Sequence, residues 1–187
     1  EYASAAAELC GERPDPQWSA VAAGLRIPHF ADGTTREHAG YDGEMIKQAD
    51  ANLLGYPLGI VTGREAQLRD LEYYERRIDP RNGPAMSYSV FAIQYARLGM
   101  AEKACEMFRR SYLPNLRPPF GVFAETATSG NPYFMTGAGG MLQAVLFGFG
   151  GLEITADGLV QRPSVLPPQW KNLRIKINGK IYQATNQ

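Results

Sequence analysis

The apolar positions of this sequence recur mostly every three or four residues, which is the pattern of helices that bury one face. Glycine and proline divide the pattern into short segments, so successive helices are expected to form hairpin pairs. Over residues 64–77, Leu68, Leu71 and Tyr74 share one face while opposite charges lie on the other. Helices are predicted at residues 1–11, 16–24, 44–54, 64–77, 86–98 and 101–112.

The stretch from Pro119 to Gly151 is the one around which we expect the rest to be organised. An extended apolar run leads into a loop of small polar residues that carries Glu125 and cannot build a core. A helix from about Phe134 to Phe149 follows, and because its apolar residues lie all round it, we expect it to be buried. A single acid on a polar loop beside a buried helix indicates a carboxylate placed in a pocket.

After residue 150 the pattern changes from a helical period to strict alternation. Two alternating runs flank a turn at Asp157, and two more flank Asn178 and Gly179, a pair that favours tight hairpins. The sequence therefore predicts a mainly α fold followed by a short C-terminal β-sheet segment, which is too small to fold alone.

Composition and charge exclude several classes of partner. The chain has 187 residues, of which 44% are hydrophobic and 20% charged, as in an ordinary globular domain. Its 19 basic residues balance its 19 acidic ones, so we expect neither nucleic acid nor an anionic membrane as partner. No apolar run approaches the roughly 20 residues of a membrane span. A neutral, polar ligand is expected, and the compartment, cytoplasmic or exported, stays open.

Two pairs of residues raise other kinds of chemistry. Cys10 and Cys105 lack metal-ligand spacing, and reduced, buried thiols are favoured over a single disulfide bridge. His29 and His38 lie with several acids in a long irregular segment over residues 26–43. A metal site is one interpretation, but the spacing matches no ligand pattern and ordinary polar loop residues are favoured. We therefore expect no metal and no organic cofactor.

Lys47 and Gln48 lie in the middle of the helix predicted at residues 44–54. Composition alone is equally compatible with a solvated helix face and with a pair of long donors that bind the hydroxyl groups of a ligand.

Three long segments resemble glycoside hydrolase family 65, in the right order and over nearly the whole chain. They are residues 40–58, with the motif Lys-Gln-Ala-Asp, residues 73–99, and residues 122–155, with Thr-Gly-Ala-Gly-Gly. This family contains disaccharide phosphorylases together with hydrolases such as acid trehalase, kojibiose hydrolase and protein-glucosylgalactosylhydroxylysine glucosidase. The resemblance is closest to the last two.

The resemblance implies the later helices of an (α/α)6 barrel at residues 1–150 and the start of a C-terminal β domain at residues 151–187. It also implies an inverting reaction on an α-glucoside, with an α-1,2 linkage preferred. The motif that carries the general acid is absent and is expected upstream of residue 1. The chain should then be inactive alone, and an upstream part of the enzyme or a second copy should cover its open barrel face.

Inverting hydrolysis needs one acid to protonate the leaving oxygen and one carboxylate to activate water, roughly 6.5–9.5 Å apart. By resemblance Glu125 is the general base, whereas Lys47 and Gln48 hold the glucose hydroxyls. The other interpretation of Glu125 is a helix cap or a solvated acid.

Two alternatives and one departure accompany this hypothesis. Phosphorylases of the family carry a Glu-Gly-Ile-His loop, but Glu125 is followed by Thr126, and neither histidine lies nearby in the sequence, so hydrolysis is preferred. A non-catalytic carbohydrate-binding or structural fragment is the alternative outside enzymes. Before the Lys-Gln-Ala-Asp motif the family commonly has Asp-Gly-aromatic, whereas this chain has Ala39-Gly40-Tyr41, so the aglycone side is expected to differ.

Overall fold

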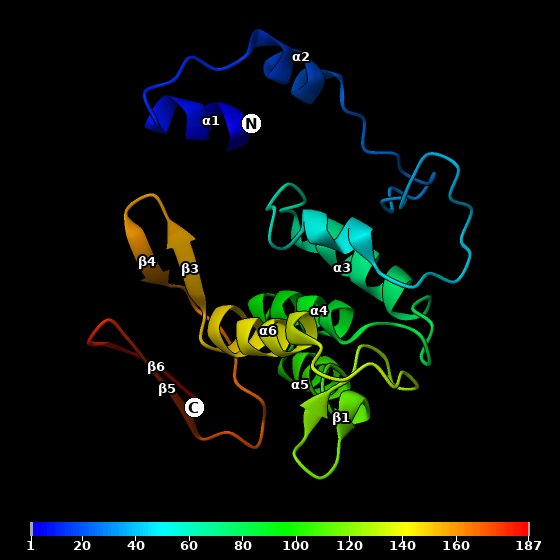
Figure 1. Ribbon diagram of the computed structural model, residues 1–187, viewed down its shortest axis with the longest axis vertical. Helices are drawn as coiled ribbons and strands as arrows, with labels where there is room; N and C mark the ends of the chain where they lie inside the picture. Colours follow the sequence, from blue (N-terminus) through cyan, green and yellow to red (C-terminus); the bar gives the residue numbers. More distant parts are fainter. Residues whose placement is uncertain (1, 187) are drawn as a thin grey trace.

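The structure, a computed structural model, describes residues 2–186, which are mainly helical with short antiparallel strand pairs (Figure 1). The helices are α1 Tyr2–Leu9, α2 Pro16–Gly24, η1 Asp50–Leu54, α3 Arg64–Glu75, α4 Ala85–Arg97, α5 Ala101–Arg110, η2 Leu113–Asn115, α6 Met135–Gln143 and the π-helical η3 Ala144–Phe149. The strands are β1 Leu116–Arg117, β2 Val122–Phe123, β3 Leu152–Thr155, β4 Gly158–Gln161, β5 Asn172–Ile177 and β6 Lys180–Thr185.

Helix α4 is the centre of the hydrophobic core. It is apolar on most sides, its Phe91 and Tyr95 are fully buried, and it packs against α5, α6 and η3. Two glycines let the continuous helix α6–η3 lie close to α4. A Cβ at Gly140 would lie 2.9 Å from the Ser89 hydroxyl oxygen, and one at Gly148 would lie 3.2 Å from the Ile93 Cα. The predicted helical pair at residues 86–98 and 101–112 is confirmed by α4 and α5.

The prediction that the helix from Phe134 to Phe149 is buried all round is wrong, although its position is confirmed. Gly137, which faces Ala85 of α4, is buried, as are Ala144 and Phe149, but Met135 is 77% and Leu142 57% exposed. Helix α4 covers only one side of an apolar helix, so the described residues leave an apolar surface open on the other.

The predicted helix at residues 44–54 is also wrong in its first half. Only η1, from Asp50 to Leu54, is helical, and Ile46 instead forms a β-bridge with Ile78. The Ile46 N–H donates to the Arg77 carbonyl at 2.8 Å, and the Ile46 carbonyl accepts from the Asp79 N–H at 3.0 Å. These long-range backbone hydrogen bonds replace the helical ones.

The irregular segment over residues 26–43 is confirmed, and it is fixed by α3. Asp70, buried on this helix, accepts hydrogen bonds from the Thr35 N–H at 2.8 Å and the Thr35 hydroxyl at 2.7 Å. The Tyr74 hydroxyl donates to the Thr35 carbonyl at 2.6 Å. A charged acceptor and a buried hydroxyl therefore order a segment that has few helical or sheet hydrogen bonds of its own.

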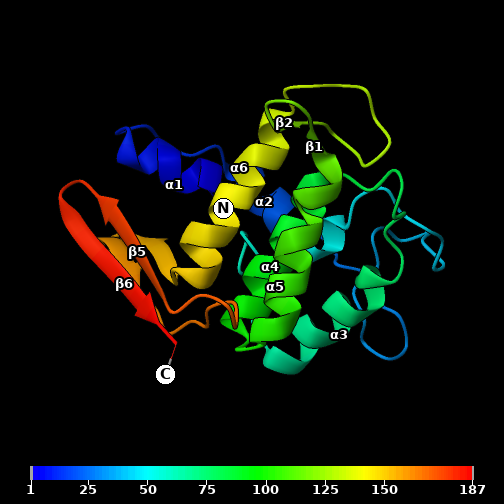
Figure 2. The ribbon, with the colours of Figure 1, turned by 90° about the horizontal axis from the view of Figure 1, so that it is seen from below.

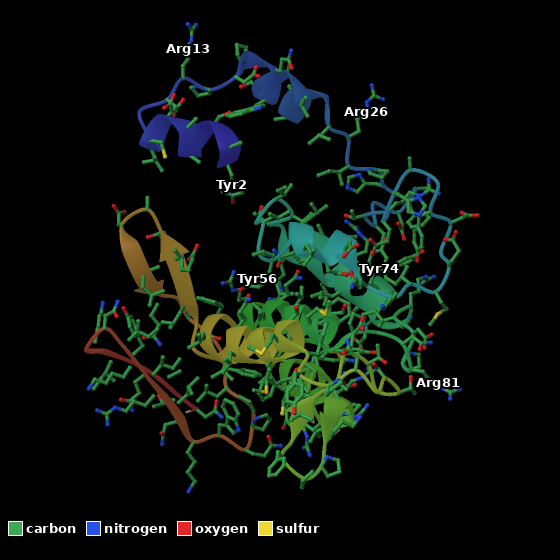
Figure 3. The ribbon with its side chains drawn as sticks, in the orientation of Figure 1. Tyr2, Arg13, Arg26, Tyr56, Tyr74 and Arg81 are labelled. Carbon is green, nitrogen blue, oxygen red and sulfur yellow. The ribbon has the colours of Figure 1, made fainter. Side chains whose placement is uncertain are left out.

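Helices α1 and α2 contact each other at the edge of the molecule and contain no buried residue (Figure 1). In Figure 3, Arg13 and Arg26 point away from the protein, whereas Tyr2 points from α1 towards the other helices. None of the helices described is long and apolar enough to cross a membrane. Both cysteines are free thiols as preferred, but the expectation that they are buried is wrong, because Cys10 is exposed and Cys105 half-buried.

Both predicted C-terminal hairpins are confirmed. Strands β3 and β4 flank the turn at Asp157, and β5 and β6 flank Asn178 and Gly179, whose positive φ angles of 49° and 81° suit a tight hairpin turn. Trp170 packs edge-to-face on Phe108 of α5 and Phe149 of η3, which attaches the β segment to the helical core. The division into two domains at residue 150 stays a prediction.

Candidate active site

Glu125 lies in the loop after β2, and its backbone is held firmly in place. Its carbonyl oxygen accepts from the Ala85 N–H at 3.2 Å and from the Asn115 side-chain amide at 3.0 Å. The preceding residue, Ala124, is fully buried. The Glu125 side chain is 28% exposed, so it is a partly shielded carboxylate on a fixed backbone.

Lys47 lies beside this carboxylate, although the two residues are 78 positions apart in the sequence. The Lys47 ammonium donates to Glu125 Oε1 at 3.0 Å, and its own side chain is 58% exposed. Because water screens an ion pair this exposed, the pair contributes little to stability. The ion pair matters because it brings the predicted base, Glu125, and one predicted sugar donor, Lys47, together at the surface.

The segment that carries Lys47 and Gln48 is irregular but fixed at both ends. Before it, Ile46 is bound to the connection between α3 and α4 as described above. After it, the Ala51 N–H at the start of η1 donates to Glu37 Oε2 at 3.1 Å. Lys47, which is exposed, and Gln48, which is half-buried, therefore lie on a backbone that has little freedom to move.

A surface depression of about 380 Å³ lies along this segment. Its size falls in the range of small-molecule sites, and acids, a histidine and long donors give it a polar wall. The lining residues are Glu37, His38, Tyr41, Ile46, Lys47, Gln48 and Asp50. Lys47 lines this depression and also contacts Glu125, so the Glu125 carboxylate is linked to the depression through this one side chain.

The ionisation of Glu37, which lines this depression, is strongly affected by its surroundings. Burial raises the pKa of the Glu37 carboxyl to about 7, and the nearby Asp50 charge adds to the effect against the lowering by the Ala51 N–H. Its Oε1 is buried and has no hydrogen-bond partner among residues 2–186. A second carboxyl, one that holds a proton near neutral pH, thus lines the same depression as Lys47 and Gln48.

Raising the pH from about 5 to about 8 should destabilise the protein through Glu37, because the folded state holds this proton more tightly than the unfolded chain does. The carboxyl has an ordinary pKa of 4.5 and a folded pKa of about 7, so its contribution is complete below 4.5 and is lost as the pH rises through 7. Glu37→Gln imitates the protonated form and should show a smaller fall in melting temperature over this range in thermal unfolding. Glu102→Gln, on an exposed face of α5, should keep the wild-type slope, and an equal slope for both variants would contradict the assignment.

The two histidines considered for a metal site each have another neighbour in the structure. His29 forms a β-bridge with Thr35, and His38 contacts the ring of Tyr41 edge-on. In the part of the chain that the structure describes, no three His, Cys, Asp or Glu side chains are placed to hold a metal ion together.

The sequence patterns do not single out Glu37, Asn115 or Arg117 as residues that build this site. Glu37 accepts from the Ala51 N–H, Asn115 donates to the Glu125 carbonyl, and Arg117 donates to the carbonyls of residues 126, 127 and 129. Contacts of this kind, between a side chain and backbone in another part of the chain, leave no spacing pattern. One feature of the sequence pointed to them: residues 126–130 include no large apolar side chain that could fix the loop in the core. Hydrogen-bond donors from other segments are therefore expected to order this loop.

No family model matches this chain. It is 49% identical to a kojibiose hydrolase from Mucilaginibacter mallensis over 94% of this chain, and 39% identical to a protein-glucosylgalactosylhydroxylysine glucosidase from Danio rerio, also over 94%. The chain spans about a quarter of these relatives, 26% and 27% of their lengths.

A solved structure described as a candidate kojibiose phosphorylase from the human microbiome is similar in fold. The TM-score is 0.51 at 22% sequence identity, over 74% of this chain and 20% of that one. This likeness concerns the fold alone.

Proposed function

We propose that this chain is part of the catalytic region of an inverting α-glucosidase of glycoside hydrolase family 65. Its substrate would be a glucose disaccharide or a glucosylated glycan, with an α-1,2 linkage preferred. Similarity to a kojibiose hydrolase and to a glucosidase over 94% of the chain supports the reaction class.

One observation carries this proposal: the 3.0 Å contact between Lys47 and Glu125 beside a polar depression. In the proposed reaction Glu125 is the general base that removes a proton from the attacking water. Its partial exposure leaves room for that water, and the fixed backbone limits the error in its position.

Lys47 and Gln48 are proposed to bind the hydroxyl groups of the glucose unit. Lys47 has three N–H donors, and only one hydrogen bond of its ammonium, to Glu125, is made within residues 2–186, so donors are left for sugar oxygens. Gln48 offers both a donor and an acceptor on the wall of the same depression.

The general acid is proposed to come from polypeptide outside these 187 residues, since no match to the family's acid motif occurs in the sequence. The helices would belong to an (α/α)6 barrel over residues 1–150, followed by a β domain that begins at residue 151. The exposed apolar side of α6, with Met135 and Leu142, is where further barrel helices or a second copy would pack. The chain alone is then expected to be inactive.

Phosphorolysis is the second candidate, and one observation favours it. His38 lines the same depression as Lys47 and Gln48, although it is far from Glu125 in the sequence. The ring N–H of a histidine and the ammonium of a lysine that line one depression would hold phosphate in place of the attacking water.

Product analysis with the full-length enzyme separates these candidates. Incubation with kojibiose and no phosphate should release β-glucose as the first product, visible by proton nuclear magnetic resonance before mutarotation, because water attacks from the face opposite the leaving group. Added inorganic phosphate should change neither rate nor product. Strict dependence on phosphate, with glucose 1-phosphate as product, would establish the phosphorylase instead. Failure to cleave kojibiose, trehalose or a glucosyl-galactose unit would favour the non-catalytic fragment.

A further inference from the structure

The loop that follows Glu125 has only a few short-range hydrogen bonds of its own, in which the Ser129 N–H donates to Thr126 Oγ1 at 3.0 Å and the Asn131 N–H donates to Ser129 Oγ at 3.0 Å. Residues 126–130 are Thr, Ala, Thr, Ser and Gly, so no large apolar side chain anchors them in the core. The loop belongs to no helix or strand, and in Figure 2 the connection between β2 and α6 reaches away from the helices. A loop of this kind becomes better ordered when its backbone carbonyls find donors elsewhere.

Arg117 provides those donors from the hairpin at the base of the loop. It is the last residue of β1 and pairs with Val122 of β2, three positions before Glu125. One nitrogen of its guanidinium donates to three carbonyl oxygens of the loop, those of Thr126 at 3.1 Å, Ala127 at 2.8 Å and Ser129 at 3.2 Å.

The other terminal nitrogen of Arg117 is bound on the near side. It donates to the carbonyls of Pro114 at 2.8 Å and Leu116 at 3.3 Å, so the side chain is itself held in one orientation. Arg117 takes part in none of the ion pairs within the described range. Arg117 is half-buried, and the hydrogen bonds that its side chain makes among residues 2–186 all go to backbone carbonyls. Its positive charge therefore serves to order the loop.

Asn115 extends the same attachment to Glu125 itself. This residue is 3% exposed, and its side-chain amide donates to the carbonyls of Ala124 at 3.1 Å and Glu125 at 3.0 Å. Its backbone carbonyl accepts from the Ala124 N–H at 2.8 Å. Asn115 and Arg117 thus bind the backbone on both sides of the Glu125 side chain, one at residues 124–125 and the other at residues 126–129.

We infer that Arg117, supported by Asn115, is a positioning residue for the Glu125 carboxylate: it fixes the loop so that this side chain faces Lys47. All its hydrogen bonds go to backbone carbonyls, so it acts through the loop and not on the ligand. This inference rests on the proposed role of Glu125. It adds a requirement that the motif around Glu125 does not contain, namely a guanidinium eight residues earlier whose planar fork binds several carbonyls at once.

The test compares Arg117→Lys and Arg117→Ala with wild type in the full-length enzyme, using kojibiose hydrolysis. Lysine keeps the charge but cannot serve both sets of carbonyls, so kcat should fall about 10- to 100-fold, as expected when a reacting group is displaced by about 1 Å. The KM should change by less than about threefold, because Lys47 and Gln48 stay in place. Methylguanidinium added to Arg117→Ala should restore part of kcat, which a general loss of folding would not allow.

Arg174→Lys, at an exposed position of β5, is the matched control and should leave kcat and KM unchanged. If Arg117→Lys keeps wild-type kcat while Glu125→Gln is inactive, the positioning role is wrong and the function stands. If Glu125→Gln itself keeps wild-type turnover, the proposed function fails first. Parallel loss of kcat and melting temperature without rescue would reduce Arg117 to a structural residue and overturn the inference.

Discussion

Glu125→Gln in the full-length enzyme should lower kcat for α-glucoside hydrolysis by about 10²- to 10⁴-fold, the range that general base catalysis supplies. Glutamine has almost the same shape, and its side-chain oxygen can still accept from the Lys47 ammonium, which donates to Glu125 Oε1 at 3.0 Å in the native protein. Substrate should therefore bind with nearly unchanged KM, whereas the attacking water loses its proton acceptor. Steady-state kinetics with kojibiose measures both constants.

The matched control for this experiment is Glu102→Gln, which removes an exposed carboxylate from the first turn of α5. It should retain wild-type kcat, so that a loss specific to position 125 can be attributed to the chemistry. Turnover within about threefold of wild type for Glu125→Gln would remove this residue from the mechanism, since a base worth at least 10²-fold cannot be absent without effect.

The second large effect is expected at Lys47. Lys47→Met keeps an unbranched side chain of similar length but removes the charge and all three donors, including the one that contacts Glu125. A hydrogen bond that involves a charged group contributes about 1.5–3 kcal/mol, so kcat/KM should fall about 10- to 150-fold. Because Lys47 contacts both the depression and the base, the loss should appear in KM as well as in kcat.

Two further variants serve as comparisons for the size of the Lys47→Met effect. Gln48→Leu removes a neutral donor and acceptor and should cost about 2- to 10-fold in kcat/KM, less than Lys47→Met, because neutral hydrogen bonds contribute only about 0.5–1.5 kcal/mol. Lys176→Met, at an exposed position of β5, should have no effect on either constant. Wild-type kcat/KM for Lys47→Met would show that the Lys47 ammonium does not bind the ligand. The depression that Lys47 lines would then not be the ligand site either.

Short-range patterns were sufficient for most of the secondary structure. The pair α4 and α5 and the β5–β6 hairpin follow from a helical period and from Asn178-Gly179, whose tight turn is decided by its own two residues. The same patterns failed at residues 44–49 and on the exposed side of α6. At Ile46 a bridge to Ile78 outweighs the local preference for helix, and burial of Leu142 depends on which other helices are present.

By itself, the sequence determined that the chain is mainly helical with β-hairpins at its end, and its motifs indicated Glu125, Lys47 and Gln48. Only the tertiary structure decided that Lys47 meets Glu125, that Glu37, with a raised pKa, lines the same depression as Lys47, and that Arg117 holds the loop. The physical reason is that helices and tight turns depend on neighbours in the chain, whereas an ionised carboxylate is positioned by donors and charges that folding brings from far along it.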